Sequence, residues 1–347
     1  MTTTSQYDLY AIGNALVDSE YEVTEAQLLA MNVEKRHMTL IDAARRAELL
    51  AQVHGVHSRK SGGGSAGNTV VALAQLGGKA FYSCCVSNDE LGAFYADDLR
   101  GNGVDSNMTA ATLPQASSAS PTGQCMVMVT PDAERSMSTY LGATADLDAT
   151  ALNAKAIAAS KIYYMEGYLA AQTNGLAAAL QGRQIAKAAG VKLATTLSDM
   201  SMINFCRPGL EAMLGDAVDY LFANEEEAQT WCGTKDMQAI IEQLSARARV
   251  VCLTRSAKGC IVLEGGTQTP APSAQVKAID TNGAGDMFAG AFLYAVTQGH
   301  SHAQAAWLAN QAAGQVVSQY GNRLTLEAMR RVRQSFVQQV TTQAVLP

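Results

Sequence analysis

Asp280-Thr281-Asn282-Gly283-Ala284-Gly285-Asp286 is the stretch of sequence that decides the fold. Val276, Ala278 and Ile279 alternate before it and predict a strand, and the apolar run 287–293 after it predicts a helix with one side in a core. A Gly-Ala-Gly turn that enters a helix leaves backbone N–H groups without intrahelical partners, and the helix dipole adds positive potential there. The stretch therefore predicts an anion-binding turn between a strand and a helix.

The carboxylate of Asp286 lies in this same turn, where a simple anion site would not place it. A carboxylate there makes sense if it takes a proton from a hydroxyl that attacks a bound phosphate. The alternative is a glycine turn in which the aspartate only caps the helix. The heptapeptide alone leaves both interpretations open.

The composition indicates one large α/β domain with a substantial core, because the 347 residues are 48% hydrophobic and 16% charged. The net charge of −6 argues against nucleic acid as the main partner. The seven cysteines form no Cys-x-x-Cys pair, so we expect reduced core thiols and a cytoplasmic protein. We expect no membrane partner, since no signal peptide is evident and no uncharged apolar run approaches a membrane span.

Strand-like and helix-like segments alternate over most of the chain, which predicts a mostly parallel sheet with helices on both faces. The expected strands are 7–13, 80–86, 162–165, 191–196, 220–223 and 250–253. The expected helices of this unit are 69–76, 91–99, 176–189, 225–231, 237–246 and 303–317.

Two regions, about 14–57 and 108–143, lack this rhythm, and we expect them to form a small β-rich lid within a single domain of residues 1–347. The first has helix-like segments at 25–31 and 42–53 and a short strand near 38–40. The second alternates on either side of Pro131 to Glu134, as a hairpin does, at 124–130 and 136–141.

The chain resembles the ribokinase-like (PfkB) kinases, which phosphorylate sugars and nucleosides with ATP. Asp280 to Asp286 is similar to the C-terminal signature of that family, and Gly63-Gly64-Ser65-x-x-Asn68 to its N-terminal signature. Within the family, two features are most similar to adenosine kinases: the stretch Gly13-Asn14-Ala15-Leu16-Val17-Asp18, and Asn282 in the C-terminal signature. The resemblance covers nearly the whole chain and implies the ribokinase-like α/β fold with its lid.

The resemblance implies a role for several groups in phosphoryl transfer. Asp286 is the expected general base, the Gly283, Ala284 and Gly285 turn is the expected anion hole, and Arg135 is expected to reach the transferring phosphate when the lid closes. Asn224 and Glu227 match an Asn-x-x-Glu motif that helps to hold Mg²⁺ and its waters. ATP and Mg²⁺ are therefore the expected cofactors, and the sequence leaves dependence on a monovalent cation such as K⁺ open.

Six residues match family positions that contact the acceptor: Asn14, Asp18, Gly63, Gly64, Asn68 and Tyr168. The carboxylate of Asp18 suits a vicinal diol because it can accept two hydrogen bonds. Tyr168 lies where adenosine kinases have an aromatic residue that stacks on adenine. Four more side chains are candidates for a base slot or for core: Met38, Leu40, Cys125 and Met126.

Three residues are the expected nucleotide contacts. Thr254 and Gly259 belong to a stretch similar to the family's Thr-x-Gly-x-x-Gly loop, in which Ser256 replaces the first glycine. That replacement leaves the path of the loop backbone open. Asn310 matches a polar residue beside the nucleotide's base.

Two other nucleotide-binding motifs are excluded. Gly62, Gly64 and Gly67 form a literal G-x-G-x-x-G, but the residues before it, 54–60, are not the apolar strand that a dinucleotide fold requires. A P-loop is absent, because Gly78-Lys79 is followed by Ala80. Histidines lie away from the predicted strand ends, which argues against a serine hydrolase.

We therefore expect an enzyme that phosphorylates the 5′-hydroxyl of a purine nucleoside, adenosine above all, with ATP. A sugar kinase of the ribokinase or fructokinase type is the first alternative. A nucleoside-binding protein without turnover is the second, and Asp286 argues against it because a binder has no use for a base there. The small-molecule acceptor and ATP are the expected partners, and the sequence leaves a monomer and a homodimer open.

Overall fold

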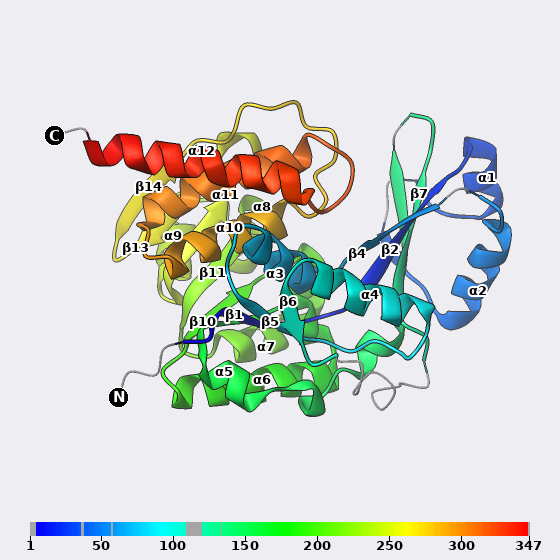
Figure 1. Cartoon of the computed structure of the whole chain (residues 1–347), viewed down its shortest axis with the longest axis horizontal. Helices are drawn as coiled ribbons and strands as arrows, with labels where there is room; N and C mark the ends of the chain where they lie inside the picture. The colour runs from blue at the N-terminus through cyan, green and yellow to red at the C-terminus, as the bar shows by residue number, and fades with distance from the viewer. Residues whose placement is uncertain (1–4, 36–37, 57, 109–119, 133, 346–347) are drawn as a thin grey trace.

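The computed structural model describes residues 5–35, 38–56, 58–108, 120–132 and 134–345, and it contains two sheets (Figure 1). The large sheet has nine strands. The strands from β6 at one edge through to β12 run parallel to their neighbours, and β13 pairs antiparallel with both β12 and β14. In spatial order these are β14 (Thr267–Ala271), β13 (Cys260–Glu264), β12 (Ala248–Thr254), β11 (Val218–Asn224), β10 (Lys192–Thr196), β9 (Ser160–Met165), β1 (Tyr7–Ile12), β5 (Ala80–Ser83) and β6 (Val104–Ser106).

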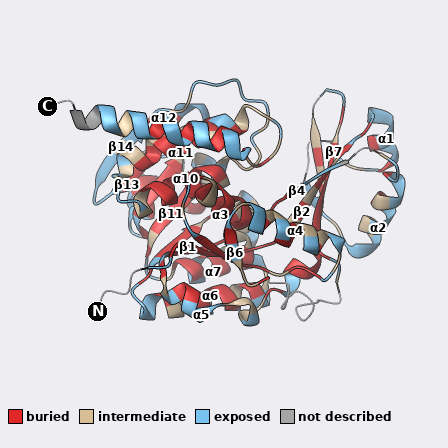
Figure 2. Cartoon of the chain, in the orientation of Figure 1, coloured by how far each residue is buried: buried red, intermediate tan, exposed pale blue. Residues whose placement is uncertain are grey.

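Helices cover both faces of the large sheet, so most of its strand residues are buried (Figures 1 and 2). One face packs against α3 (Ser65–Gln75), α4 (Glu90–Gly101), α10 (Ala284–Thr297), α11 (His302–Val317) and α12 (Leu326–Val345). The other face packs against α5 (Ala154–Ala158), α6 (Thr173–Ala188), α7 (Met200–Leu214), α8 (Glu225–Cys232) and α9 (Met237–Ser245). The predicted mostly parallel sheet with helices on both faces is confirmed.

The small sheet stands apart from the large one and has helices on one face (Figure 1). Its five strands, in spatial order, are β3 (Met38–Leu40), β8 (Arg135–Tyr140), β7 (Gly123–Val129), β2 (Leu16–Glu22) and β4 (Ser58–Gly62). Tyr21, Met126 and Met128 point from it into a core with helices α1 (Glu25–Ala30) and α2 (Ala43–Gln52). Asp18 and Glu20 alternate with the buried residues of β2, so they lie on the opposite face.

The two regions expected to form a lid supply four of the five strands of the small sheet, and the predicted hairpin is present as β7 and β8. The fifth strand, β4, lies outside the expected range. It was missed because Ser58-Arg59-Lys60 is polar, and edge strands with polar side chains give no apolar alternation. Residues 109–119 of the expected lid lie outside the described residues.

One local prediction is wrong. Residues 276–279 form no strand: Val276 and Ile279 are 44% and 48% exposed, and the Ile279 N–H donates to the Val317 carbonyl of α11. The apolar alternation was misleading here because β14 already forms the edge of the sheet. The alternative in which Asp286 only caps the helix does not hold, because the N-cap of α10 is Gly283 and Asp286 lies in the first turn. Helices α7 and α12 had not been predicted.

The cysteines of the structure are free thiols, and four of them, Cys84, Cys125, Cys252 and Cys260, are buried. The other three are partly buried, so the expectation of reduced core thiols holds for most of them. Across the described part of the chain, the helices are too short or too polar to cross a bilayer.

Short 3₁₀ helices of three or five residues complete the secondary structure. The 3₁₀ helices are η1 (Gly142–Asp146), η2 (Ala149–Ala151), η3 (Gly167–Ala171) and η4 (Ser256–Lys258). Two of them, η3 and η4, follow strands of the large sheet at the edge where its parallel strands end, which is the edge where open α/β sheets bind ligands.

Candidate active site

The N-terminal ends of α3 and α10 meet around the carboxylate of Asp286. The hydroxyl of Ser65 donates to Oδ1 at 2.6 Å, and Nδ2 of Asn68 donates to Oδ2 at 2.9 Å. The two helices pack closely because Gly290 has no side chain, and a Cβ there would lie 2.4 Å from the Thr69 carbonyl oxygen. The N-terminal signature therefore holds the carboxylate of the C-terminal signature by both of its oxygens.

The environment of Asp286 favours a base that works near neutral pH. Burial raises the pKa of this carboxyl to about 6, while the hydrogen bonds from Ser65 and Asn68 and the positive charge of Arg323 act in the opposite direction. A base is most effective when its pKa lies near the working pH, because it is then ionised and still basic enough to accept a proton.

The turn before Asp286 has the geometry expected of an anion site. Gly283 has a φ of 74°, and a Cβ there would lie 2.5 Å from the Asn322 carbonyl oxygen, so only glycine fits. The Ala284 N–H donates to the Thr281 carbonyl at 3.3 Å, whereas the N–H groups of Gly285 and Asp286, in the first turn of α10, have no acceptor within the helix. No described atom lies within 4 Å of the position that a Cβ on Gly285 would take. An anion can therefore approach these N–H groups beside Asp286.

The glycines of the N-terminal signature make room for the groups around the acceptor site. A Cβ on Gly63 would lie 2.4 Å from Oδ1 of Asp18, and one on Gly64 would lie 2.0 Å from the Asn14 carbonyl oxygen. Gly64 also has a φ of 83°. Asp18 comes from β2 of the small sheet, and burial raises the pKa of its carboxyl to about 7. The structure thus brings Asp18, Asn68 and Asp286 to one place.

Asn14 follows β1 and is held by a buried glutamate, Glu166, that sequence reasoning missed. Nδ2 of Asn14 donates to Oε1 of Glu166 at 2.7 Å, and Oε2 of Glu166 accepts from the Ala66 N–H at 2.8 Å. Oδ1 of Asn14 accepts from Gln172 and Thr144. Burial raises the pKa of Glu166 to about 7. Asn14 and Glu166 together therefore connect the segments that carry Ala66, Thr144 and Gln172.

Arg135 begins β8 and connects the small sheet with the C-terminal signature. Its guanidinium donates to Glu20 Oε1 at 2.7 Å and pairs with Oδ2 of Asp280 at 3.2 Å. It also lies 5.4 Å from the ring centroid of Tyr320. Sequence reasoning placed Arg135 at a hairpin tip, where a side chain is solvated by default, but this side chain is only 12% exposed.

Asn224 and Glu227 form a reciprocal cap at the start of α8. Asn224 accepts from the Glu227 N–H at 2.8 Å, and Glu227 accepts from Nδ2 of Asn224 at 2.6 Å and from its N–H at 3.1 Å. Burial raises the pKa of Glu227 to about 7, and the neighbouring Asp199 and Asp286 add to this rise. A cation nearby would offset that cost, so the pair fits a magnesium site.

The fit to magnesium is indirect. Within the described residues there is no group of three or more His, Cys, Asp or Glu side chains that could hold a metal ion. Mg²⁺ commonly keeps several waters and takes one or two carboxylates together with substrate phosphates. Glu227 would act in this way, through water.

The three expected nucleotide contacts lie along the β12, β13 and β14 edge of the large sheet. A Cβ on Gly259 would lie 2.1 Å from the Ala271 carbonyl oxygen, and Nδ2 of buried Asn310 donates to the same oxygen at 3.0 Å. Thr254 ends β12. Ser256 has a φ of 51°, so the loop keeps a left-handed residue where the family pattern has glycine.

The candidates for the base slot separate into two groups. Tyr168 is half-buried in η3, and Cys125 pairs in register with Asp18 and so shares its face of the small sheet. Met126 instead lies in the core under α1 and α2. Met38 and Leu40 are 48% and 60% exposed on the edge strand β3. Tyr168 interacts electrostatically with Asp286 and Cys125 lies beside Asp18, so these two stay candidates for the base slot.

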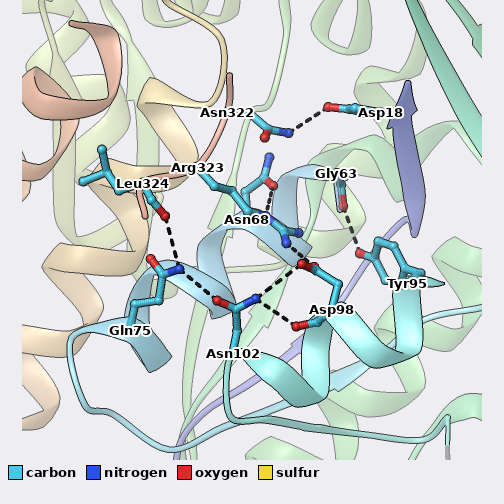
Figure 3. Close-up of polar contacts among 10 residues, drawn as sticks. All are labelled: Asp18, Gly63, Asn68, Gln75, Tyr95, Asp98, Asn102, Asn322, Arg323 and Leu324. Carbon is cyan, nitrogen blue, oxygen red and sulfur yellow. Dashed lines mark hydrogen bonds and ion pairs between the residues drawn. The ribbon is translucent and has the colours of Figure 1, made fainter. Parts of the chain in front are cut away.

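Two further residues that sequence reasoning missed are Asn322 and Arg323, in the loop between α11 and α12 (Figure 3). Nδ2 of Asn322 donates to Asp18 at 2.8 Å, and Nε of Arg323 donates to Oδ1 of Asn68 at 2.8 Å. No sequence signal pointed to them, because a polar loop after a helix is ordinary. Glu166 could have been found, since it directly follows β9 as Asn14 follows β1.

Comparison with known proteins agrees with this geometry. The model of the pfkB family of carbohydrate kinases matches residues 34–329. A crystal structure of adenosine kinase from Sinorhizobium meliloti is 35% identical, covers 95% of this chain and 99% of its own, and superposes with a TM-score of 0.84. A probable sugar kinase from Rhizobium etli is 34% identical with the same coverage and a TM-score of 0.85.

A curated relative points the same way. An adenosine kinase from Schizophyllum commune is 29% identical over 328 residues, which is 85% of this chain and 90% of the relative. The chain therefore belongs to the pfkB family of carbohydrate kinases, and the ribokinase-like fold is confirmed. It is an ATP-dependent phosphotransferase whose acceptor is a carbohydrate or a nucleoside.

Proposed function

We propose that this pfkB-family kinase transfers the γ-phosphoryl group of ATP to the 5′-hydroxyl of a purine nucleoside, with adenosine as the preferred acceptor. The observation that carries the proposal is the convergence of Asp18, Asn68 and Asp286, in which the acceptor-matching residues lie beside a buried carboxylate with a pKa of about 6. The similarity to adenosine kinases over nearly the whole chain supports a nucleoside as the acceptor.

Asp286 would act as the general base. Its ionised carboxylate accepts the proton of the 5′-hydroxyl while that oxygen forms its bond to the phosphorus atom, and the bond to the leaving ADP oxygen breaks. Ser65 and Asn68 hold both carboxylate oxygens, which fixes the direction in which the base faces. The backbone N–H groups of the turn that Gly283, Ala284 and Gly285 form, that of Gly285 above all, would stabilise the charge on the transferring group.

A bound magnesium ion would supply positive charge that offsets part of the charge of the phosphates. Asn224 and Glu227 would hold its waters from the start of α8. Thr254, Gly259 and Asn310 would line the nucleotide side at the edge of the large sheet. With these assignments, the base and the metal would both belong to the body of the protein, by which we mean the large sheet and the helices on its two faces.

The small sheet would act as a lid that closes over the acceptor and excludes water. On closure Arg135 would change its partners, because its guanidinium forms ion pairs with Glu20 and Asp280 in this structure. An incoming phosphate would compete for the same guanidinium. Hydrogen exchange with and without adenosine and a non-hydrolysable ATP analogue tests this. We expect protection in β2 and β7, and unchanged exchange in both strands would contradict a closing lid.

The preference for a nucleoside over a free sugar depends on a slot for the base. Asp18 and Asn68 would read the ribose diol of either acceptor, so they do not decide between the two. Tyr168 is the residue placed to stack on a base, and such a stack contributes ~1–3 kcal/mol. A Tyr168→Leu variant should therefore lose kcat/KM for a nucleoside and keep it for ribose.

The test is a competition with adenosine, inosine, guanosine, ribose and fructose at equal concentration in the presence of ATP and Mg²⁺. We expect adenosine to have the largest kcat/KM, and Tyr168→Leu to lower it about tenfold or more. Phe205→Leu is the matched control, since Phe205 is 83% exposed on α7. If ribose or fructose wins, the protein is a sugar kinase. If inosine or guanosine has the largest kcat/KM, the acceptor is still a purine nucleoside, but adenine is not the preferred purine.

A further inference from the structure

The loop between α11 and α12 contacts both signatures and the small sheet. The Gly321 N–H donates to Oδ2 of Asp280 at 2.9 Å, and the Asn322 carbonyl lies against Gly283 of the anion turn. The Asn322 side chain donates to Asp18. Two consecutive side chains of one loop, Asn322 and Arg323, therefore reach the two residues that would read the acceptor (Figure 3).

Arg323 is buried and held on two sides. Its side chain is 9% exposed, its Nε donates to Oδ1 of Asn68, and its Nη1 pairs with Asp98 of α4. The pair lies against Gly62, where a Cβ would come within 2.3 Å of Asp98 Oδ2 and 2.6 Å of Arg323 Nη1. The first glycine of Gly62-Gly63-Gly64 thus makes room for this ion pair, as Gly63 makes room for Asp18.

Arg323 determines which way the amide of Asn68 faces. An asparagine amide has a donor end and an acceptor end, whereas a guanidinium has donors only. Oδ1 of Asn68 must therefore face Arg323, and Nδ2 then faces Asp286. If the amide turned over, its oxygen would face the carboxylate of Asp286 and two acceptors would lie in contact. Hydrogen bonds therefore run outward from Arg323, to Asp98 on one side and through Asn68 to Asp286 on the other.

We propose that Asn322 and Arg323 are positioning residues, which orient Asp18 and Asn68 for the acceptor and, through Asn68, orient the base Asp286. The inference rests on the proposed roles of Asp18, Asn68 and Asp286 in this site. It adds two residues that touch neither acceptor nor nucleotide in the proposed mechanism and act through the side chains that do.

Arg323 also contributes its charge to the site. The carboxylates that interact with Asp286 come from three other elements: Asp18 of β2, Glu166 after β9 and Glu227 of α8. Tyr164 of β9 and Tyr168 of η3 also interact with it. Arg323 opposes these acidic groups and lowers the pKa of both Asp286 and Asp18 from where burial alone would place it. Loss of the charge should therefore move the pH profile of the reaction, which a purely structural ion pair would not do.

The experiment compares Arg323→Met with Arg323→Lys and with a partly buried control, Arg183→Met. Arg183 lies in α6 and bonds the Leu214 carbonyl away from the site. Steady-state kcat and KM are measured from pH 5 to 8 with the acceptor that the wild type uses best, together with Tm.

For Arg323→Met we expect kcat/KM to fall about 10–100-fold, because a misplaced group in an active site costs about that much. We also expect the acid limb to move up by about one pH unit. Arg323→Lys should keep the limb in place and still lose kcat/KM, since lysine has no planar fork to span Asn68 and Asp98. Arg183→Met should lower Tm alone. Asn322→Ala should raise KM for the acceptor more than it lowers kcat.

Arg323→Met with wild-type kcat/KM and acid limb, but a lower Tm, would overturn the proposal. Arg323→Lys with wild-type kcat/KM would overturn the need for a planar fork that spans Asn68 and Asp98, because lysine also has donors only and one donor would then suffice for Asn68. If Arg323→Met does not fold, the double variant Asp98→Asn, Arg323→Met removes the unpaired charge and is read by the same criteria. The wild-type acceptor panel separates the two levels. A sugar as best acceptor contradicts the proposed nucleoside kinase, while the Arg323 comparison can still succeed or fail.

Discussion

The two sheets of this kinase differ in what their faces do. The large sheet is buried on both faces, and its parallel strands bring Asn14, Glu166 and Asn224 to one edge. The small sheet is buried on one face only, and its other face presents Asp18, Glu20 and Arg135. The described contacts of these three side chains with the body are polar, as in Arg135 with Asp280 and Asn322 with Asp18.

This difference suggests a division of work. Apolar layers on both faces give the large sheet a fixed shape, which suits a base and an anion turn that must not move. Polar contacts can be exchanged for contacts with a ligand at little cost, which suits a part that holds the acceptor and releases the product. We therefore expect substitutions in the body to lower turnover and a substitution at Asp18 of the small sheet to weaken acceptor binding. Arg135, which reaches from the small sheet to Asp280 of the body, is the exception and should affect turnover.

The largest effect should come from Asp286→Asn in the body. Turnover should fall by ~10²–10⁴-fold, the usual contribution of a general base, with a small change in acceptor KM. In the wild type, kcat should rise with pH and level off above about 6, because Asp286 must lose its proton before it can accept one. The variant should lose this acid limb. Asp236→Asn, at the exposed start of α9, is the control and should change neither. Near-normal kcat in Asp286→Asn would remove it as the base.

Arg135→Gln should have the next largest effect, since this residue joins the two regions. Loss of one charged donor to a transferring phosphate should lower kcat by about 10²-fold. Arg59→Gln is matched to it, because Arg59 lies in β4 of the same sheet and is 71% exposed. Stopped-flow and steady-state rates would compare the two. Equal rates in both variants would show that Arg135 serves only as an ion pair.

A smaller effect is expected at the start of α8. Asn224→Ala and Glu227→Gln should raise the Mg²⁺ concentration for half-maximal rate several-fold, with acceptor KM nearly unchanged. Loss of the cap should also cost about 1 kcal/mol of stability. Ser301→Ala removes a comparable cap from α11 and controls for that cost. If all three variants titrate with Mg²⁺ like the wild type, Asn224 and Glu227 are only a helix cap.

The body was more predictable from the sequence than the small sheet. Strands such as β1 and β11 are buried on both faces, so they appear as continuous apolar runs. The strand β4 is polar and was missed, and 276–279 alternates without a neighbouring strand to pair with. The pattern of apolar residues indicates which segments are buried. It does not indicate which exposed segment pairs with a neighbouring strand.

The part of the candidate site that could be predicted consists of residues that belong to the two signatures. Asp286 and Asn68 meet as the two signatures imply. Asn322 and Arg323 could not be predicted, because their partners Asp18 and Asn68 are distant in sequence and no local rule joins them. Gly63 and Gly64 were expected to contact the substrate. In the structure Asp18 and Asn14 lie so close to them that a side chain would clash, which is sufficient reason for glycine at both positions.

Calorimetric binding of adenosine to Asp18→Asn and Asp286→Asn, with no ATP present, tests the division between the two regions most directly. Asp18→Asn removes a charged hydrogen-bond acceptor of the small sheet, and we expect Kd to rise about 10–100-fold. Asp286→Asn removes a group used in the transition state, so Kd should stay within about twofold of wild type. Weak binding in Asp286→Asn together with wild-type binding in Asp18→Asn would contradict the account.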